Sequence, residues 1–188
     1  MASPELGVWS CALCGELVYS LGPPTRCPAC GALPGLLRGP GGELRPLGRE
    51  LSWPETLQEG GRRAIQQELD TAELYSRVAA AAQHPLLARS FRALQRIESR
   101  HATLLCTIFL QKRPAPTLRP DLQGQHDRAL LALVRAREDD TIGLYQAQLP
   151  GCAGTELEQV YRGLIAVEED HNALVAQLVA VVGGEAPV

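Results

Sequence analysis

The chain of 188 residues is 45% hydrophobic and 21% charged, which suits one globular domain, or a small module with one larger domain, and excludes general disorder. A formal net charge of −3 and an aromatic content of 4% argue against a nucleic-acid-binding surface. No apolar run approaches the roughly 20 residues that a membrane-spanning helix needs. Residues 1–10 lack a basic stretch followed by an apolar one, so we expect no secretory signal and a cytoplasmic protein.

Four of the six cysteines form two pairs near the N-terminus, in the sequences CALCG (residues 11–15) and CPACG (residues 27–31). Two such turns hold one tetrahedral ion through four thiolates, and glycine suits the tight turn that ends each of them. Zinc would make the site structural and iron would make it a one-electron carrier; the spacing leaves both open. The predicted ligands are Cys11, Cys14, Cys27 and Cys30.

Composition divides the chain into three parts, and the cysteine region is the first of them. Residues 9–35 are rich in turn residues and too short for a core of their own, so we assign them to a small β module around the metal. The glycine and proline content of residues 36–61 predicts a linker. Helical spacing of apolar residues then takes over, and residues 62–183 are assigned to a four-helix bundle of the all-α class. Proline and glycine divide this part into predicted helices at 62–83, 86–112, 121–149 and 154–181.

The helical part repeats at an offset of seventy positions. Residues 68–75 read ELDTAELY, and residues 138–145 read EDDTIGLY. Residues 91–104 and 161–174 keep the same offset, with FRALQRIESRHATL against YRGLIAVEEDHNAL. This pattern indicates a duplicated helical hairpin, in which the first two helices correspond to the last two.

The repeated glutamates and histidines fall on the apolar stripe of each predicted helix. Four buried carboxylates would be costly without cations, and two divalent ions would balance their charge. One Glu from each of two helices and Glu-x-x-His from each of the other two form the ligand set of ferritin-like di-iron and di-manganese proteins. Carboxylate and imidazole ligands suit iron or manganese better than structural zinc. The predicted ligands are Glu68, Glu98, His101, Glu138, Glu168 and His171.

Two tyrosines also recur, since Tyr75 and Tyr145 each lie two turns beyond the first glutamate of their repeat. Each is either a core aromatic or the donor of a hydrogen bond to a ligand carboxylate. Cys106 and Cys152 are expected to be packing residues. Residues 113–120 contain three prolines and reach about 25–31 Å when extended, near the length needed to cross the bundle. If that reach falls short, the hairpins would pair between two chains as a swapped dimer.

Together, the stretch WSCALCGELVYSLGPPTRCPACGAL and the helices with E-x-D-T-x-x-L-Y and E-x-x-H resemble the rubrerythrin family. The resemblance covers residues 9–35 and 62–181, with the module first, the reverse of that family's commonest order. It implies one iron in a rubredoxin-like module and two irons in a ferritin-like bundle. Two positions depart from the family pattern. Thr141 replaces an additional carboxylate, which argues against redox-linked iron movement, and Glu16 replaces an aromatic residue, which favours zinc in the module.

The resemblance implies an oxidoreductase that acts against oxidative stress by reducing hydrogen peroxide to water. Its electrons would pass from an external reductase through the four-cysteine iron, between the subunits of a homodimer or higher homo-oligomer. A ferroxidase or iron-handling protein that uses dioxygen at the same centre is an alternative, with di-manganese catalase chemistry as a weaker one. The alternative from another class is a non-catalytic protein, with zinc in the module and a bundle that serves docking.

Overall fold

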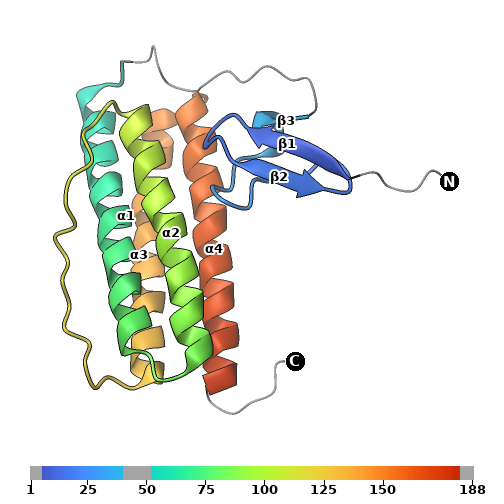
Figure 1. Cartoon of the computed structure of the whole chain (residues 1–188). Coiled ribbons are helices and arrows are strands. Elements are labelled where there is room, and N and C mark those ends of the chain that lie inside the picture. The colour runs from blue at the N-terminus through green and yellow to red at the C-terminus, as the bar shows by residue number, and fades with distance from the viewer. Residues whose placement is uncertain (1–5, 40–51, 183–188) are drawn as a thin grey trace.

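The apolar stripes pack against one another as four long helices in the computed structural model, which describes residues 6–39 and 52–182 (Figure 1). Helices α1 and α2 form one antiparallel hairpin, α3 and α4 form another, and α1 also packs against α3. The predicted four-helix bundle is therefore confirmed. None of the described helices is long and apolar enough to cross a membrane. The helices are α1 (Glu55–Ala81), α2 (Pro85–Ile108), α3 (Asp127–Cys152) and α4 (Glu156–Val182).

Helix α1 begins at Glu55, within the segment expected to be a linker, and it includes Gly60 and Gly61. Glycine normally weakens a helix, but both positions face close neighbours. A Cβ at Gly60 would lie 1.9 Å from the side chain of Gln148, and one at Gly61 would lie 2.5 Å from the ring of Phe109. These glycines therefore allow close packing inside a helix, whereas in the sequence they resemble a helix boundary.

Helix α3 begins at Asp127, later than the position 121 expected from the sequence. The residues before it include Gly124 with φ of +74°, a turn conformation. The buried carboxylate of Asp127 accepts hydrogen bonds from the backbone N–H groups of Gln83 and His84, each at 2.8 Å. Asp127 therefore ties the start of α3 to the turn between α1 and α2.

The connection from α2 to α3 runs along the length of the bundle beside α1 (Figure 1). Asp70 of α1 holds it there, because its carboxylate accepts hydrogen bonds from the backbone N–H groups of Thr117, at 2.6 Å, and Leu118, at 3.0 Å. The hydroxyl of Thr117 donates a third hydrogen bond at 2.8 Å. Burial raises the pKa of Asp70, but these hydrogen bonds outweigh it and hold the pKa below its ordinary value. Within this one chain, both hairpins belong to the same bundle.

Replacing Asp70 with alanine is expected to lower the free energy of unfolding by about 2–3 kcal/mol, because four donors, the side-chain amide of Gln66 among them, lose a charged acceptor. Asp140, its counterpart in the repeat, is exposed. Asp140→Ala is therefore the matched control and should change stability by less than about 0.5 kcal/mol. Urea unfolding of the two variants, followed by circular dichroism, measures the difference. Equal stabilities would show that Asp70 does not hold the connection.

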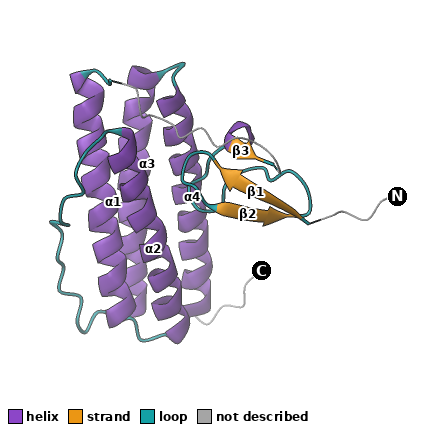
Figure 2. Cartoon of the chain, turned by 45° about the horizontal axis from the view of Figure 1, so that its top comes forward, coloured by secondary structure: helices purple, strands orange, loops and turns teal. Residues whose placement is uncertain are grey.

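In the described residues 6–39, the module forms a three-stranded antiparallel sheet of order β2-β1-β3 (Figure 2). Its strands are β1 (Gly7–Cys11), β2 (Leu17–Ser20) and β3 (Leu37–Arg38). The last strand lies beyond position 35, so part of the expected linker completes the sheet. Figures 1 and 2 show the module lying beside α4.

The module contacts the bundle through apolar side chains, which share one core cluster with it, and through backbone and charged groups. Gly31 packs on Gly163 of α4 so closely that a Cβ at Gly31 would lie 1.8 Å from the Gly163 carbonyl oxygen. Arg26 forms an ion pair with Asp170 of α4 and also donates a hydrogen bond to the Ala166 carbonyl at 3.3 Å. This exposed ion pair adds little to stability by itself, and the close backbone contact fixes the distance between module and bundle.

Candidate metal centres

The two cysteine turns have matching geometry. The N–H of Gly15 bonds to the Cys11 carbonyl, and the N–H of Gly31 bonds to the Cys27 carbonyl, both at 2.9 Å. Both glycines have positive φ, +76° and +66°, which a side chain would strain. The turns bring the four cysteine sulfur atoms together, all within 4.8 Å of one another. The cluster consists of Cys11, Cys14, Cys27 and Cys30.

These four thiols suit one tetrahedral ion. The sulfur atoms of Cys11 and Cys30 lie 3.7 Å apart, as do those of Cys14 and Cys27. Such spacing is expected for thiolates around one zinc or iron ion, whose bonds to sulfur are about 2.3 Å long. The set fits a metal ion and leaves open which metal binds.

The six ligand residues predicted from the helical repeat meet in the middle of the bundle. Their ligand atoms form two groups, each within 4.8 Å, and Glu98 and Glu168 belong to both. Glu68 and His101 complete the first group, whereas Glu138 and His171 complete the second. Glu68 of α1 therefore belongs to one group only and Glu138 of α3 to the other. The two groups share the carboxylates of the two Glu-x-x-His pairs.

The cluster is buried and its polar atoms are poorly paired. All four glutamates are 0% exposed and His171 is 4% exposed. Among the described residues, both oxygens of Glu138 and both of Glu168 lack a hydrogen-bond partner. Nδ1 of His171 lies 2.9 Å from a Glu98 oxygen and 2.8 Å from a Glu168 oxygen, yet hydrogen-bonds to neither. Buried polar atoms that converge while most of them lack a hydrogen-bond partner fit a pair of metal ions.

The electrostatics of the protein alone agree with this interpretation. Burial, and then the neighbouring charge of Glu168, raise the pKa of Glu138 to about 8. Burial also raises the pKa of Glu68 well above its ordinary value. For His101, burial alone would lower the pKa, but the Glu68 charge and carboxylate hydrogen bonds outweigh it and raise the pKa well above its ordinary value. Protons are therefore retained in the cluster where cations would otherwise balance the carboxylates.

One hydrogen bond joins the two candidate metal centres within the same chain. Nδ1 of His101 faces the carboxylates, 3.1 Å from Glu98, while its Nε2 lies 3.1 Å from the carbonyl oxygen of Ala29. Ala29 lies in the second cysteine turn, directly before Cys30. One hydrogen bond thus connects a candidate ligand of the bundle with the four-cysteine cluster. The expected passage between subunits is not needed to bring the two centres together.

The two repeated tyrosines have different surroundings. The hydroxyl of Tyr145 donates a hydrogen bond to Glu68, on the neighbouring helix α1. Burial and the Glu68 charge raise the pKa of Tyr145 well above its ordinary value, so its hydroxyl keeps the proton. Tyr75 packs on Phe91, with ring centroids 5.3 Å apart, and its hydroxyl has no partner among the described residues. The structure therefore brings Tyr145, and not Tyr75, to a candidate ligand.

The two departures from the family pattern have structural explanations. Glu16 forms an exposed ion pair of 2.6 Å with Arg100 of α2, so this position contacts the bundle. Thr141 is 1% exposed; its hydroxyl donates to the Arg137 carbonyl and accepts from the amide of Gln67. Neutral hydrogen-bonding groups therefore occupy the place of the additional carboxylate.

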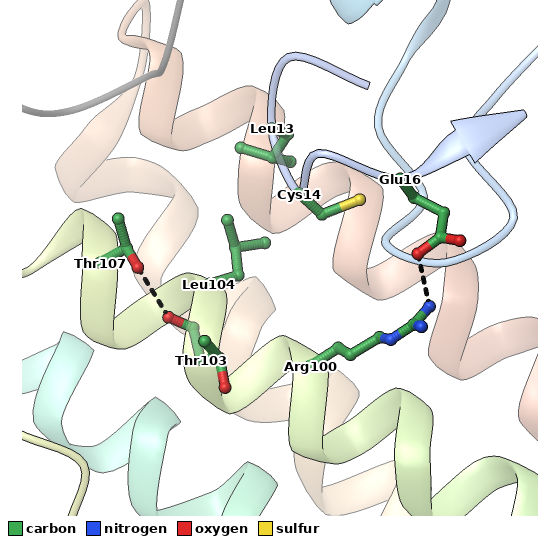
Figure 3. Close-up of a pocket in the computed structure, with 7 residues that line it drawn as sticks. All are labelled: Leu13, Cys14, Glu16, Arg100, Thr103, Leu104 and Thr107. Carbon is green, nitrogen blue, oxygen red and sulfur yellow. Dashed lines mark hydrogen bonds and ion pairs between the residues drawn. The ribbon is translucent and has the colours of Figure 1, made fainter. Parts of the chain in front are cut away.

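The four-cysteine cluster has one accessible side. Cys14 is the only one of its cysteines that is not fully buried, and it lines a pocket of about 360 Å³ between the module and α2 (Figure 3). Arg100 and Glu16 lie at one side of the pocket, and Thr103 and Thr107 at the other (Figure 3). Cys106 and Cys152 are buried in the hydrophobic core, as expected of packing residues.

Sequence reasoning missed Ala29 and Gly163, which shape the contact between the centres. A backbone carbonyl has no signature in a sequence, so Ala29 was not identifiable. Gly163 had a weak signal, because its counterpart in the repeat is Ala93 and a glycine inside a helix usually has a packing reason.

Two solved structures share the bundle. Ferritin-like, diiron-carboxylate proteins from Bacillus anthracis str. Ames match with a TM-score of 0.59 and 24% identity, over 66% of this chain and 96% of that one. Rhodobacter capsulatus bacterioferritin, solved with a metal-free dinuclear site and heme iron, matches with a TM-score of 0.57 and 21% identity, over 71% and 89%. Comparison with sequence families and with curated proteins gave no match.

At these identities, the similarity establishes the fold. The chain has a ferritin-like four-helix bundle, preceded by a small three-stranded sheet in its described N-terminal part. Its buried Glu/His cluster fits two iron ions, and its four-cysteine cluster can bind a further metal ion.

Proposed function

We propose that the protein is a rubrerythrin-type peroxidase, which reduces hydrogen peroxide to water with electrons relayed through an iron in the four-cysteine site. The observation that carries the proposal is the contact between His101 and Ala29. A one-electron carrier can pass electrons to a redox centre when the two lie close together. Here a short run of covalent bonds through Cys30 and one hydrogen bond joins them.

Two iron ions in the bundle would each supply one electron for cleavage of the peroxide O–O bond, which consumes two protons and yields two waters. The protein's own groups would prepare the site. Glu98 and Glu168 belong to both ligand groups and would be shared by the two metal positions. Tyr145 keeps a proton on its hydroxyl beside Glu68. Burial of the cluster excludes bulk water and strengthens its electrostatic interactions.

The half-buried Cys14 supports a route for electrons from outside. An external reductase would approach the four-cysteine site at the pocket beside Cys14, because the other three sulfur ligands are buried. Electrons would then pass through the second cysteine turn to His101. This route lies within one chain and therefore places no requirement on the oligomeric state.

Anaerobic reduction followed by rapid mixing tests the proposal. We expect peroxide to oxidise both centres much faster than air does, with the four-cysteine iron oxidised after the bundle iron and in proportion to the peroxide added. Absorbance of the oxidised iron–thiolate site reports the second step. If peroxide oxidises neither centre faster than air, the peroxidase proposal fails.

Two alternatives predict different results in the same preparation. Rapid oxidation of added ferrous ions by dioxygen, with many ions retained per chain, would identify a ferroxidase or iron-storage protein. A colourless protein with one zinc per chain and no metal in the bundle after iron-replete expression would identify the docking function. The ferritin-like fold suits the first alternative as well as it suits the peroxidase.

A further inference from the structure

The duplicated hairpins give the bundle two nearly equivalent halves, and the module touches the histidine of only one. His101 and His171 correspond in the repeat, and both turn Nδ1 toward carboxylate oxygens. Nε2 of His101 lies 3.1 Å from the Ala29 carbonyl oxygen. Nε2 of His171 is buried and has no hydrogen-bond partner in the part of the chain that the structure describes. The two histidine rings are therefore held differently.

The hydrogen bond to Ala29 fixes the state of the His101 ring. A carbonyl oxygen only accepts, so Nε2 carries a proton, and Nδ1, which faces the carboxylates, is the nitrogen that can bind a metal ion once it has lost its own proton. A histidine that binds a metal ion through one nitrogen usually donates a hydrogen bond from the other, and that partner keeps the ring in place. Loss of such a partner typically lowers metal affinity by about 10–100-fold.

The asymmetry extends to the surface on which the module rests. Gly163 is buried beneath Gly31, whereas Ala93, its counterpart in the repeat, is exposed on α2. A Cβ at Gly163 would lie 3.0 Å from the backbone of Gly31, closer than ordinary contact. A larger side chain there would lift the second cysteine turn, and Ala29 with it, away from His101.

We propose that the module controls metal loading of the bundle: by docking the Ala29 carbonyl against His101, it makes the metal position of Glu68 and His101 the tighter of the two. This inference rests on the proposed di-metal centre and adds that the docked module sets the order in which its two positions fill. The position of Glu138 and His171 receives no such support. The bundle therefore fills in two steps, and the separation of those steps depends on the docked module.

Manganese titration tests the proposal, because Mn²⁺ suits carboxylate and imidazole ligands whereas thiolates retain zinc. The full chain is prepared with one zinc per chain in the module, and electron paramagnetic resonance measures the free Mn²⁺. We expect the wild type to bind two Mn²⁺ in two resolved steps. Gly163→Val should weaken the first step about 10–100-fold and bring the two steps together. Ala93→Val, the matched substitution on the exposed face of α2, should leave both steps unchanged.

The outcomes separate this proposal from the one on which it rests. If Gly163→Val binds Mn²⁺ in the same two steps as the wild type, the module does not control metal loading, and the proposed di-metal centre is unaffected. A wild type that binds no Mn²⁺ would overturn the di-metal centre itself. Retention of one zinc per chain in Gly163→Val shows that the module is folded, so that a weakened first step is due to its displacement.

A second measurement needs no metal in the bundle. Nuclear magnetic resonance of the zinc-loaded protein with ¹⁵N-labelled histidine reports the ring N–H groups directly. We expect a ring N–H of His101 that exchanges slowly with solvent in the wild type and in Ala93→Val, and rapidly in Gly163→Val. If the wild type has no slowly exchanging signal that His101→Gln removes, the contact with Ala29 is not formed and the proposal is wrong.

Discussion

Glu168→Ala is expected to remove both metal ions from the bundle, whereas Glu68→Ala should remove only one. The difference follows from the two ligand groups, because Glu168 belongs to both and Glu68 belongs to one. Loss of Glu168 would leave each position with three of its four protein ligands, and only Glu98 would still be shared by the two. We expect Mn²⁺ affinity at both positions to fall by at least about 100-fold in Glu168→Ala. Equilibrium dialysis of zinc-loaded protein gives the number of ions bound.

The neighbouring Glu169 supplies the control, since it is exposed and lies outside both groups. Glu169→Ala should bind two ions with unchanged affinity. Circular dichroism should show that Glu168→Ala keeps its helices, because the buried stripe of α4 retains Tyr161, Leu164 and Val175. A variant that still binds two ions without Glu168 would refute the shared-carboxylate arrangement.

Cys30→Ser is expected to abolish metal binding in the module and to unfold its sheet while the bundle stays folded. The three strands are short, and the free energy of binding to such a site is also folding free energy. Replacing one of four thiolates should weaken zinc binding by roughly a thousandfold or more. Metal analysis after dialysis against a chelator measures the loss.

Cys106→Ala is the matched control, because Cys106 is a buried thiol of α2 outside the four-cysteine cluster. It should retain one zinc per chain after the same dialysis. The same comparison bears on the peroxidase proposal: Cys30→Ser should still react once with peroxide at the bundle but should not be re-reduced. Continued turnover at the wild-type rate would mean that electrons reach the bundle by another route.

Much of this arrangement is visible in the sequence because its signals are local or periodic. The cysteine turns have fixed spacing, and Glu98 and His101 are brought together by a single helical turn. The repeat then supplies Glu168 and His171 independently. Helix periodicity puts such residues on one face, and the cost of burying them unpaired indicates the metal.

What the sequence did not predict depends on contacts between distant segments. Asp70 recurs in the repeat as Asp140, yet only Asp70 meets the connection near Thr117, so the pattern alone could not assign its role. The contact of Ala29 with His101 uses a backbone atom, which every residue possesses. The early start of α1 depends on close packing that makes glycine favourable inside a helix.

The glycines of α1 also have a consequence for local unfolding. Each glycine weakens a helix by about 1 kcal/mol relative to alanine, so the first two turns of α1 are stabilised by their packing against Phe109 and Gln148. Glu68 lies farther along the helix, among residues with ordinary helical preference. Local opening should therefore begin at the Glu55 end and stop before it reaches Glu68. The helix can fray at one end while its ligand carboxylate stays in place.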